Sequence, residues 1–197
     1  GLNEFATRLP SAFFGSLTVL LTFFLTRELL RSRFNRDLLS ILASFFLAIS
    51  PWHIMLSRAA FEANVATFFL VAGVTFFLLG MRKAWFFVLS AISFSLSLYT
   101  FNTARIMAPL LVLMLVAAFY KKLWQNTLGN RANKKWVVGS FLLGVAIILP
   151  LIFFLITPQA ATRYKEVNIF SDNNIVIYAN QDIVNDGGAW WSKIIHN

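Results

Sequence analysis

Five polar residues stand at the edges of apolar runs, where their side chains could bind a charged substrate. They are Arg8, Arg58, Glu62, Asn102 and Arg105. A guanidinium group keeps its charge and can bind phosphate through two parallel N–H donors, so three arginines favour recognition of a phosphate-like anion. Each arginine taken alone is equally consistent with a side chain that only extends from a membrane span to the interface and has no binding role. Together, we predict, they contribute to a polar site at a membrane surface.

The segment 50–64 is central to this prediction because polar groups interrupt two apolar runs there. Pro51 predicts the end of the preceding helix, since proline lacks an N–H and clashes with the turn before it. If the chain is helical beyond this point, Arg58 and Glu62 lie four residues apart on one face. A structural Arg58–Glu62 ion pair is then slightly favoured over direct catalysis by Glu62.

Residue types exclude several other chemistries. The chain has no cysteine and two histidines far apart, which argues against a zinc cluster. No Walker-type glycine loop, GxSxG or HExxH motif is present. His53 follows Trp52 and could bind a substrate, but an aromatic pair that anchors the loop at the interface fits better.

The elements that must position these residues are apolar helices. Of 197 residues, 58% are hydrophobic and 13% are charged, whereas a soluble domain has roughly a quarter charged residues. A helix needs about 20 apolar residues to cross a bilayer. The sequence predicts an all-α polytopic membrane protein with about six spans: Pro10 to Thr26, Leu38 to Leu56, Ala63 to Gly80, Ala84 to Thr100, Ile106 to Tyr120, and Trp136 to Thr157.

Basic residues predict the orientation of these spans. Eleven of the 17 lysines and arginines fall in alternate connections: Arg27, Arg31, Arg33, Arg36, Arg82, Lys83, Lys121, Lys122, Arg131, Lys134 and Lys135. By the positive-inside rule those connections are cytoplasmic, and the five candidate site residues then face the extracytoplasmic side. The net charge of +9 therefore reflects membrane topology, and nucleic acid is not a predicted partner.

The composition changes after the last apolar run. Residues 158–197 contain several asparagines and an Asp186-Gly187-Gly188 turn signal, so we predict a membrane domain over 1–157 and the start of an extracytoplasmic loop or domain over 158–197. The chain begins with Gly1 rather than Met and ends without a terminating feature. We expect it to be an internal piece of a longer polypeptide.

Three stretches carry a family resemblance. They are GLNEFATRLPSA at 1–12, SPWH followed by SRAAFEAN within 50–64, and YTFNTAR at 99–105. In this order among six spans they resemble bacterial dolichyl-phosphate-mannose-protein mannosyltransferase-like proteins, which are membrane glycosyltransferases of the GT-C fold. The similarity extends to about Pro158, which covers nearly all of the predicted membrane domain.

The resemblance implies that a sugar is transferred from a polyprenyl-phosphate donor to a protein, lipid or glycan acceptor at the outer face of the plasma membrane. In such enzymes the catalytic base is an acidic residue in the first outer loop, which should precede Gly1, so the catalytic residue stays unknown and the piece alone should be inactive. Arg8, Arg58 and Arg105 are the candidate contacts to the donor phosphate. The residues identify no cofactor, although the family allows a divalent metal.

Two other classes of protein stay open. A transporter or flippase for an anionic lipid or solute would place its charges near the bilayer midplane, often with broken helices in paired halves. Here the charges lie at the ends of the predicted spans, which favours the enzyme. A non-catalytic membrane subunit is the third alternative.

Overall fold

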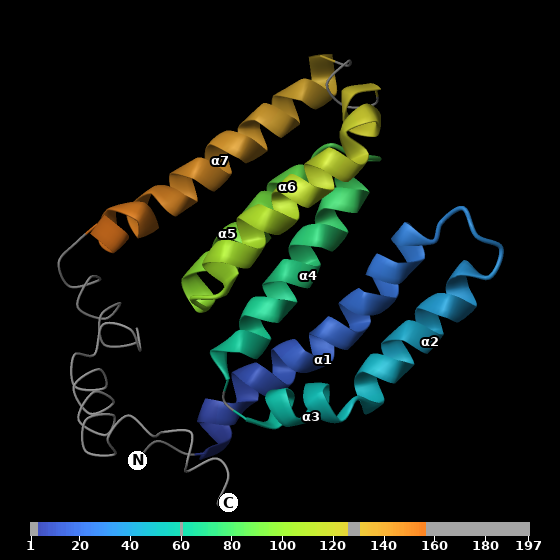
Figure 1. The fold of residues 1–197 in the computed structure, drawn as a ribbon, viewed down its shortest axis with the longest axis vertical. Coiled ribbons are helices and arrows are strands. Elements are labelled where there is room, and N and C mark those ends of the chain that lie inside the picture. The colour runs from blue at the N-terminus through green and yellow to red at the C-terminus, as the bar shows by residue number, and fades with distance from the viewer. Residues whose placement is uncertain (1–3, 60, 126–130, 157–197) are drawn as a thin grey trace, which may run out of the picture. The chain divides into compact units, whose positions relative to one another are not determined.

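The computed structural model describes residues 4–59, 61–125 and 131–156, and within these residues the secondary structure is helical, with no strand (Figure 1). The helices are α1 (Glu4–Leu29), α2 (Arg36–Ile49), α3 (Pro51–Arg58), α4 (Glu62–Gly80), α5 (Phe86–Thr100), α6 (Ala104–Leu123) and α7 (Arg131–Ile156). The prediction of an all-α polytopic membrane protein is confirmed. The predicted extracytoplasmic segment 158–197 lies outside the described residues.

Within the described residues, the number of full-length spans is smaller than the six predicted. Four stretches in the described residues are long and apolar enough to cross a bilayer, namely Ala6–Leu29, Glu62–Gly80, Ala104–Leu123 and Asn133–Ile156. A fifth is obtained if the bent pair α2 and α3 is one span. The 15 residues of α5 are apolar but reach only about 22 Å at 1.5 Å per residue, short of the ~30 Å hydrocarbon core. Conversely, the fifth predicted span is longer than expected, with 20 residues in α6.

The second predicted span is broken at Ser50. Its backbone is extended (φ −63°, ψ 123°), and Pro51 occupies the first position of α3. Proline fits the first turn of a helix, because a backbone N–H there would make no intrahelical hydrogen bond. It cannot continue the helix before it. The two helices consequently meet at a bend of 57°, and the predicted role of Pro51 is confirmed.

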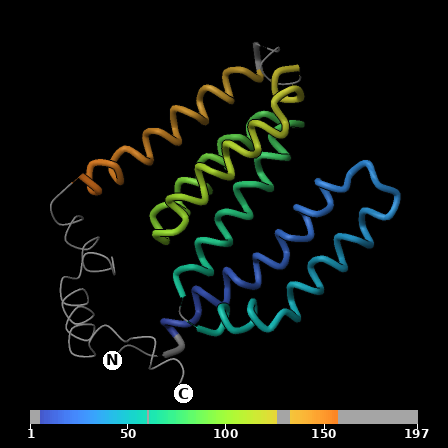
Figure 2. The backbone as a smooth tube through the Cα atoms, in the orientation of Figure 1, coloured from blue at the N-terminus to red at the C-terminus, as the bar shows by residue number. Residues whose placement is uncertain are grey.

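Residues 1–149 form one compact unit, and residues 150–156 complete α7. Within the unit α1 packs against α2, α3 and α4, while α4 packs against α5 and α6. The tube in Figure 2 shows that successive long helices reverse direction. Contacts agree with this: the Arg27 Nε donates to Asp37 Oδ1 at 2.8 Å across the α1–α2 hairpin.

The reversals give this unit two chemically different ends. The α3 end comprises the start of α1, α3, the start of α4 and the turn 101–103 between α5 and α6. The basic end comprises the segments 30–35 and 81–85 with the adjoining helix ends, and carries Arg27, Arg31, Arg33, Arg36, Arg82, Lys83, Lys121 and Lys122. All five candidate site residues lie at the α3 end; the side of the membrane that this end faces stays a prediction.

Small residues hold α4 and α5 together. An ideal Cβ on Gly73 would lie 2.9 Å from the ring of Phe94, and one on Gly80 would lie 2.9 Å from the ring of Phe87. The Ser90 hydroxyl donates to the Gly73 carbonyl at 2.8 Å. Close helix contact of this kind is typical of membrane proteins, where hydroxyls also satisfy backbone carbonyls. The serines of α5 are therefore packing residues.

Candidate functional site

A hydrogen-bonded junction joins the starts of α1 and α4 to α3. The Asn64 amide Nδ2 donates to the Ser11 carbonyl at 2.7 Å and lies 3.2 Å from the Ser11 hydroxyl. That hydroxyl donates in turn to the Leu56 carbonyl on α3 at 3.0 Å. Asn64 and Ser11 are each only 3% exposed. Because buried polar groups are costly when unpaired, this chain of bonds fixes the three helices against one another.

A second contact brings α3 directly onto the backbone of α1. His53 Nε2 lies 3.1 Å from the Gly15 carbonyl oxygen, and since a carbonyl can only accept, Nε2 is the donor and carries the proton. The Ser57 hydroxyl donates to the His53 carbonyl at 2.7 Å. The His53 ring thus holds α3 to α1, whereas Trp52 is 73% exposed. His53 therefore holds α3 to α1 through a backbone carbonyl, and the aromatic pair expected to anchor the loop at the membrane interface stays a prediction.

The absence of a side chain at Gly15 makes this approach possible. An ideal Cβ there would lie 2.2 Å from Ser57 Oγ, 2.8 Å from Ser57 Cβ and 3.1 Å from Asn64 Nδ2. All three distances are shorter than ordinary van der Waals contacts. Gly15 is therefore the position at which α1 accommodates both α3 and the start of α4.

Arg58 and Glu62 do not share a helix face, so that prediction is wrong. α3 ends at Arg58, and Ala59 (ψ 149°) and Phe61 (ψ 123°) are extended before α4 begins at Glu62. Both side chains are exposed, and the described residues contain no ion pair between them. The expected structural pair is absent because the intervening backbone separates two helices.

Asn102 belongs to the tight turn between α5 and α6, and Arg105 is the second residue of α6. The Arg105 backbone N–H donates to the Asn102 carbonyl at 3.1 Å. The Arg105 Nε lies 3.4 Å from the Leu98 carbonyl on the preceding helix, and the side chain is half-buried. The guanidinium is therefore oriented by the end of α5, while Asn102 is exposed.

Arg8 lies on α1 one turn before Ser11 and is exposed. The structure thus places Arg8, Arg58 and Glu62 on the helices of the α1–α3–α4 junction, with Asn102 on the α5–α6 turn and Arg105 at the start of α6 at the same end. Their role in binding a donor stays a prediction. Among the described residues, no three His, Cys, Asp or Glu side chains gather as a metal-ligand set.

The residues that sequence reasoning missed are the ones that build the junction. Ser11, Gly15 and Thr18 recur at a spacing of four and three, which puts small residues on one face of α1. That pattern is a recognisable signal for close helix packing. Asn64 could also have been noticed, because an amide in an apolar span needs a partner.

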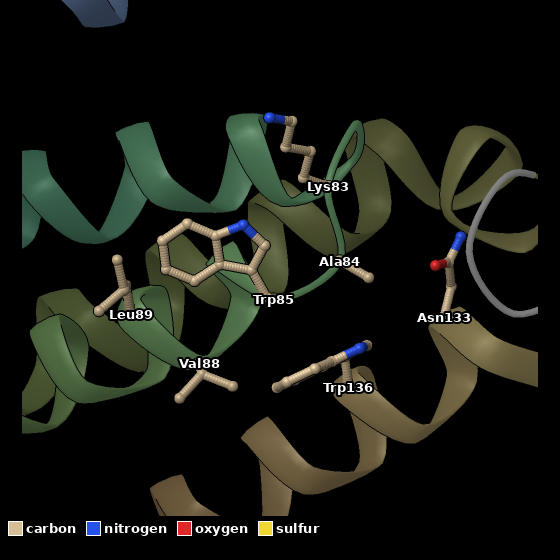
Figure 3. Close-up of a pocket in the computed structure, with 7 residues that line it drawn as sticks. All are labelled: Lys83, Ala84, Trp85, Val88, Leu89, Asn133 and Trp136. Carbon is tan, nitrogen blue, oxygen red and sulfur yellow. The ribbon is translucent and has the colours of Figure 1, made fainter.

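A pocket of about 510 Å³ opens at the basic end, where the starts of α5 and α7 approach each other. Figure 3 shows Trp85 and Trp136 beside this space, with Val88 on its wall and the Lys83 ammonium pointing away. Its described lining is mainly apolar. Tryptophans at a helix end are typical of the membrane interface, so we assign no chemistry to this pocket.

The apolar helices and their lengths define a multi-pass integral membrane protein with a polar junction at one end. The family model for dolichyl-phosphate-mannose-protein mannosyltransferase matches residues 1–162. The match covers most of the chain, and the protein belongs to that family of membrane glycosyltransferases. Searches of curated proteins and of solved structures gave no significant match.

Proposed function

We propose that this protein transfers a mannosyl or related sugar from a polyprenyl-phosphate donor to a protein, lipid or glycan acceptor, with the α3 end facing the extracytoplasmic side. In that reaction the bond between the anomeric carbon and the phosphate oxygen breaks, and the polyprenyl phosphate leaves with the electron pair. The acceptor hydroxyl forms the new bond and gives its proton to a base. We assign no residue of the described helices to that base.

The observation that carries the proposal is the position of Arg58. It is an exposed guanidinium at the end of α3, a helix held to α1 through His53 and Ser11. Because the backbone of α3 is fixed in this way, the guanidinium is kept at this end of the bundle, where it can stabilise the charge that builds on a leaving phosphate. Arg8 and Arg105 add two further cations at the same end of the bundle.

The location of the helix breaks favours a glycosyltransferase over a transporter. Transporters commonly bind their substrate near the midplane, at helices interrupted within the bilayer. Here the bend at Ser50 and the extended residues at Ala59 and Phe61 lie beside the end of α1 that carries Arg8. A polar site at a bundle end suits a lipid-linked donor whose phosphate lies at the interface.

The first test is the Arg58→Ala variant of the full-length protein in membranes supplied with radiolabelled polyprenyl-phosphate sugars. We expect the rate of transfer to fall about tenfold or more, because the variant loses one charge-assisted hydrogen bond in the transition state. Arg58→Lys should recover part of the rate, because it restores the charge without the planar fork. Arg33→Ala, an exposed arginine at the basic end, is the matched control and should retain full activity.

Two results would contradict this assignment. Unchanged transfer by Arg58→Ala would remove Arg58 from the donor site while leaving the enzyme assignment intact. Label that crosses the bilayer without being transferred to any acceptor would replace the glycosyltransferase with a transporter.

The proposed orientation has a separate test in single-cysteine labelling. The chain has no cysteine of its own, so Asn35→Cys at the basic end and Thr103→Cys at the α3 end each introduce one reactive thiol into it. We expect a membrane-impermeant maleimide added to intact cells to label the Thr103→Cys variant, and to label Asn35→Cys only after permeabilisation. Both residues are exposed. The opposite labelling pattern would invert the proposed orientation.

A further inference from the structure

A second charged site lies at the basic end, far along α1 from the junction. It is a pocket of about 370 Å³ bounded by the ends of α1, α4 and α6. Its charged lining consists of Glu28, Arg31, Arg82 and Lys122. Three cations thus face one carboxylate, which leaves an excess of two positive charges.

The two guanidinium groups of this pocket are only loosely paired. Glu28, whose side chain is 17% exposed, lies 3.8 Å from Arg31 Nη1 and 3.6 Å from Arg82 Nη1. Both distances exceed a hydrogen bond, so their N–H donors are available to another acceptor. Arg27 differs, because its Nε donates to Asp37 at 2.8 Å. Glu28 therefore holds Arg31 and Arg82 near each other without occupying their donors.

The remainder of the pocket is apolar. Leu78 is 3% exposed and belongs to the core between the helices, and Met81 and Phe119 pack against that core. Leu29 also lines the pocket and is 54% exposed. Cationic groups at the helix ends thus adjoin apolar surface on the spans, an arrangement that matches a molecule with an anionic head and hydrocarbon chains.

We propose that this pocket binds the headgroup phosphate of an anionic membrane phospholipid, with Arg31, Arg82 and Lys122 as the phosphate ligands. Basic pockets between the ends of transmembrane helices are suited to such headgroups, because each Lys or Arg near the surface adds to the attraction. Guanidinium donors add bidentate bonds to phosphate oxygens. The inference does not depend on sugar transfer, which we propose takes place at the opposite end.

The competing explanation is that these cations only balance the carbonyl ends of three helices and set the membrane topology. The experiment therefore compares two variants with the same loss of charge at the same end. Arg31→Gln with Arg82→Gln removes the two guanidiniums of the pocket. Arg33→Gln with Lys121→Gln removes two exposed cations that do not line it.

The measurement is native mass spectrometry of the purified full-length protein titrated with phosphatidylglycerol or with phosphatidylcholine. We expect phosphatidylglycerol to bind selectively, with about a tenfold or greater loss of affinity in the pocket variant and no change in the matched control. Glu28→Gln should bind phosphatidylglycerol more tightly, because it raises the excess charge and leaves both guanidiniums unpaired. A gain of affinity cannot arise from misfolding.

Equal losses in the two double variants would overturn the proposal in favour of general surface charge. No loss in either variant would also overturn it. Complete displacement of phosphatidylglycerol by millimolar glycerol 3-phosphate would identify a site for a free phosphate compound instead of a lipid.

Discussion

Gly15→Ala is expected to separate α3 from α1 and to abolish most of the activity of the full-length protein. A methyl group at this position would lie 2.2 Å from Ser57 Oγ and 2.8 Å from Ser57 Cβ. Rotation of the serine hydroxyl can relieve the first contact but not the second, because the Cβ is fixed to the backbone of α3. The helices must therefore move apart, and the hydrogen bond from His53 to Gly15 is lost with them. Overpacking of this kind costs about 1–3 kcal/mol.

The chain provides a matched control for this substitution in Gly139. It also lies inside a long helix, but an added Cβ there meets no atom within 4 Å. Gly139→Ala should leave activity unchanged and stabilise the helix slightly, since alanine is the better helix former by about 1 kcal/mol. Thermal unfolding in detergent and sugar transfer in membranes would both be measured. If Gly15→Ala and Gly139→Ala behaved alike, the close contact between α1 and α3 would be wrong.

Asn64→Asp is expected to be the most damaging single change at the junction among near-isosteric substitutions. The Asn64 amide donates to both the carbonyl and the hydroxyl of Ser11. A carboxylate of the same shape offers only acceptors, so it would face the Ser11 carbonyl oxygen without a bond. The side chain is 3% exposed, and an unpaired buried charge is not hydrated. We expect a loss of about 3 kcal/mol or more in stability, measured as the unfolding midpoint in detergent.

Two further substitutions separate the effect of a buried charge at position 64 from the effect of losing the hydrogen bonds to Ser11. Asn64→Ala removes the donor without adding a charge and should cost about 1–2 kcal/mol, within the range for polar contacts between membrane helices. Thr67→Ala is the control, since Thr67 lies about one turn after Asn64 on α4. Thr67 is exposed, and its hydroxyl donates to the Ala63 carbonyl of its own helix. It should be near neutral. An Asn64→Asp protein as stable as Asn64→Ala would contradict the expectation of an unpaired buried charge at this position.

The membrane helices could be predicted from the sequence because they depend on local composition. Each apolar run is long enough to satisfy its backbone internally, and only helices do this within one segment. Pro51 marks the break after α2 by removing a donor and obstructing the preceding turn. The alternation of basic connections likewise follows from the order of residues, and the structure places Arg58 and Arg105 at one end of the bundle.

The end of α3 could not be predicted in this way. Arg58, Ala59, Ala60 and Phe61 contain no proline or glycine, and alanine and arginine are good helix formers. Local propensity therefore predicts one continuous helix, with Arg58 and Glu62 on a common face. In the structure α3 is bonded to α1 through His53 and Ser11 while α4 begins a separate span, and tertiary contacts override propensity there.

The sequence by itself determined the helical class, the positions of the apolar runs, the break at Pro51 and the family to which the chain belongs, because all of these depend on runs of neighbouring residues. It did not determine how many of those runs form full-length spans. Only the tertiary structure decided which polar residues meet. Asn64 and Ser11 are 53 residues apart, and His53 and Gly15 are 38 apart. Their pairing depends on how closely α1, α3 and α4 approach, and that distance is set by the missing side chain at Gly15. Periodicity within one segment carries no information about the partner in another segment. The junction and the pocket lined by Glu28 could therefore be identified only from the packing of the helices.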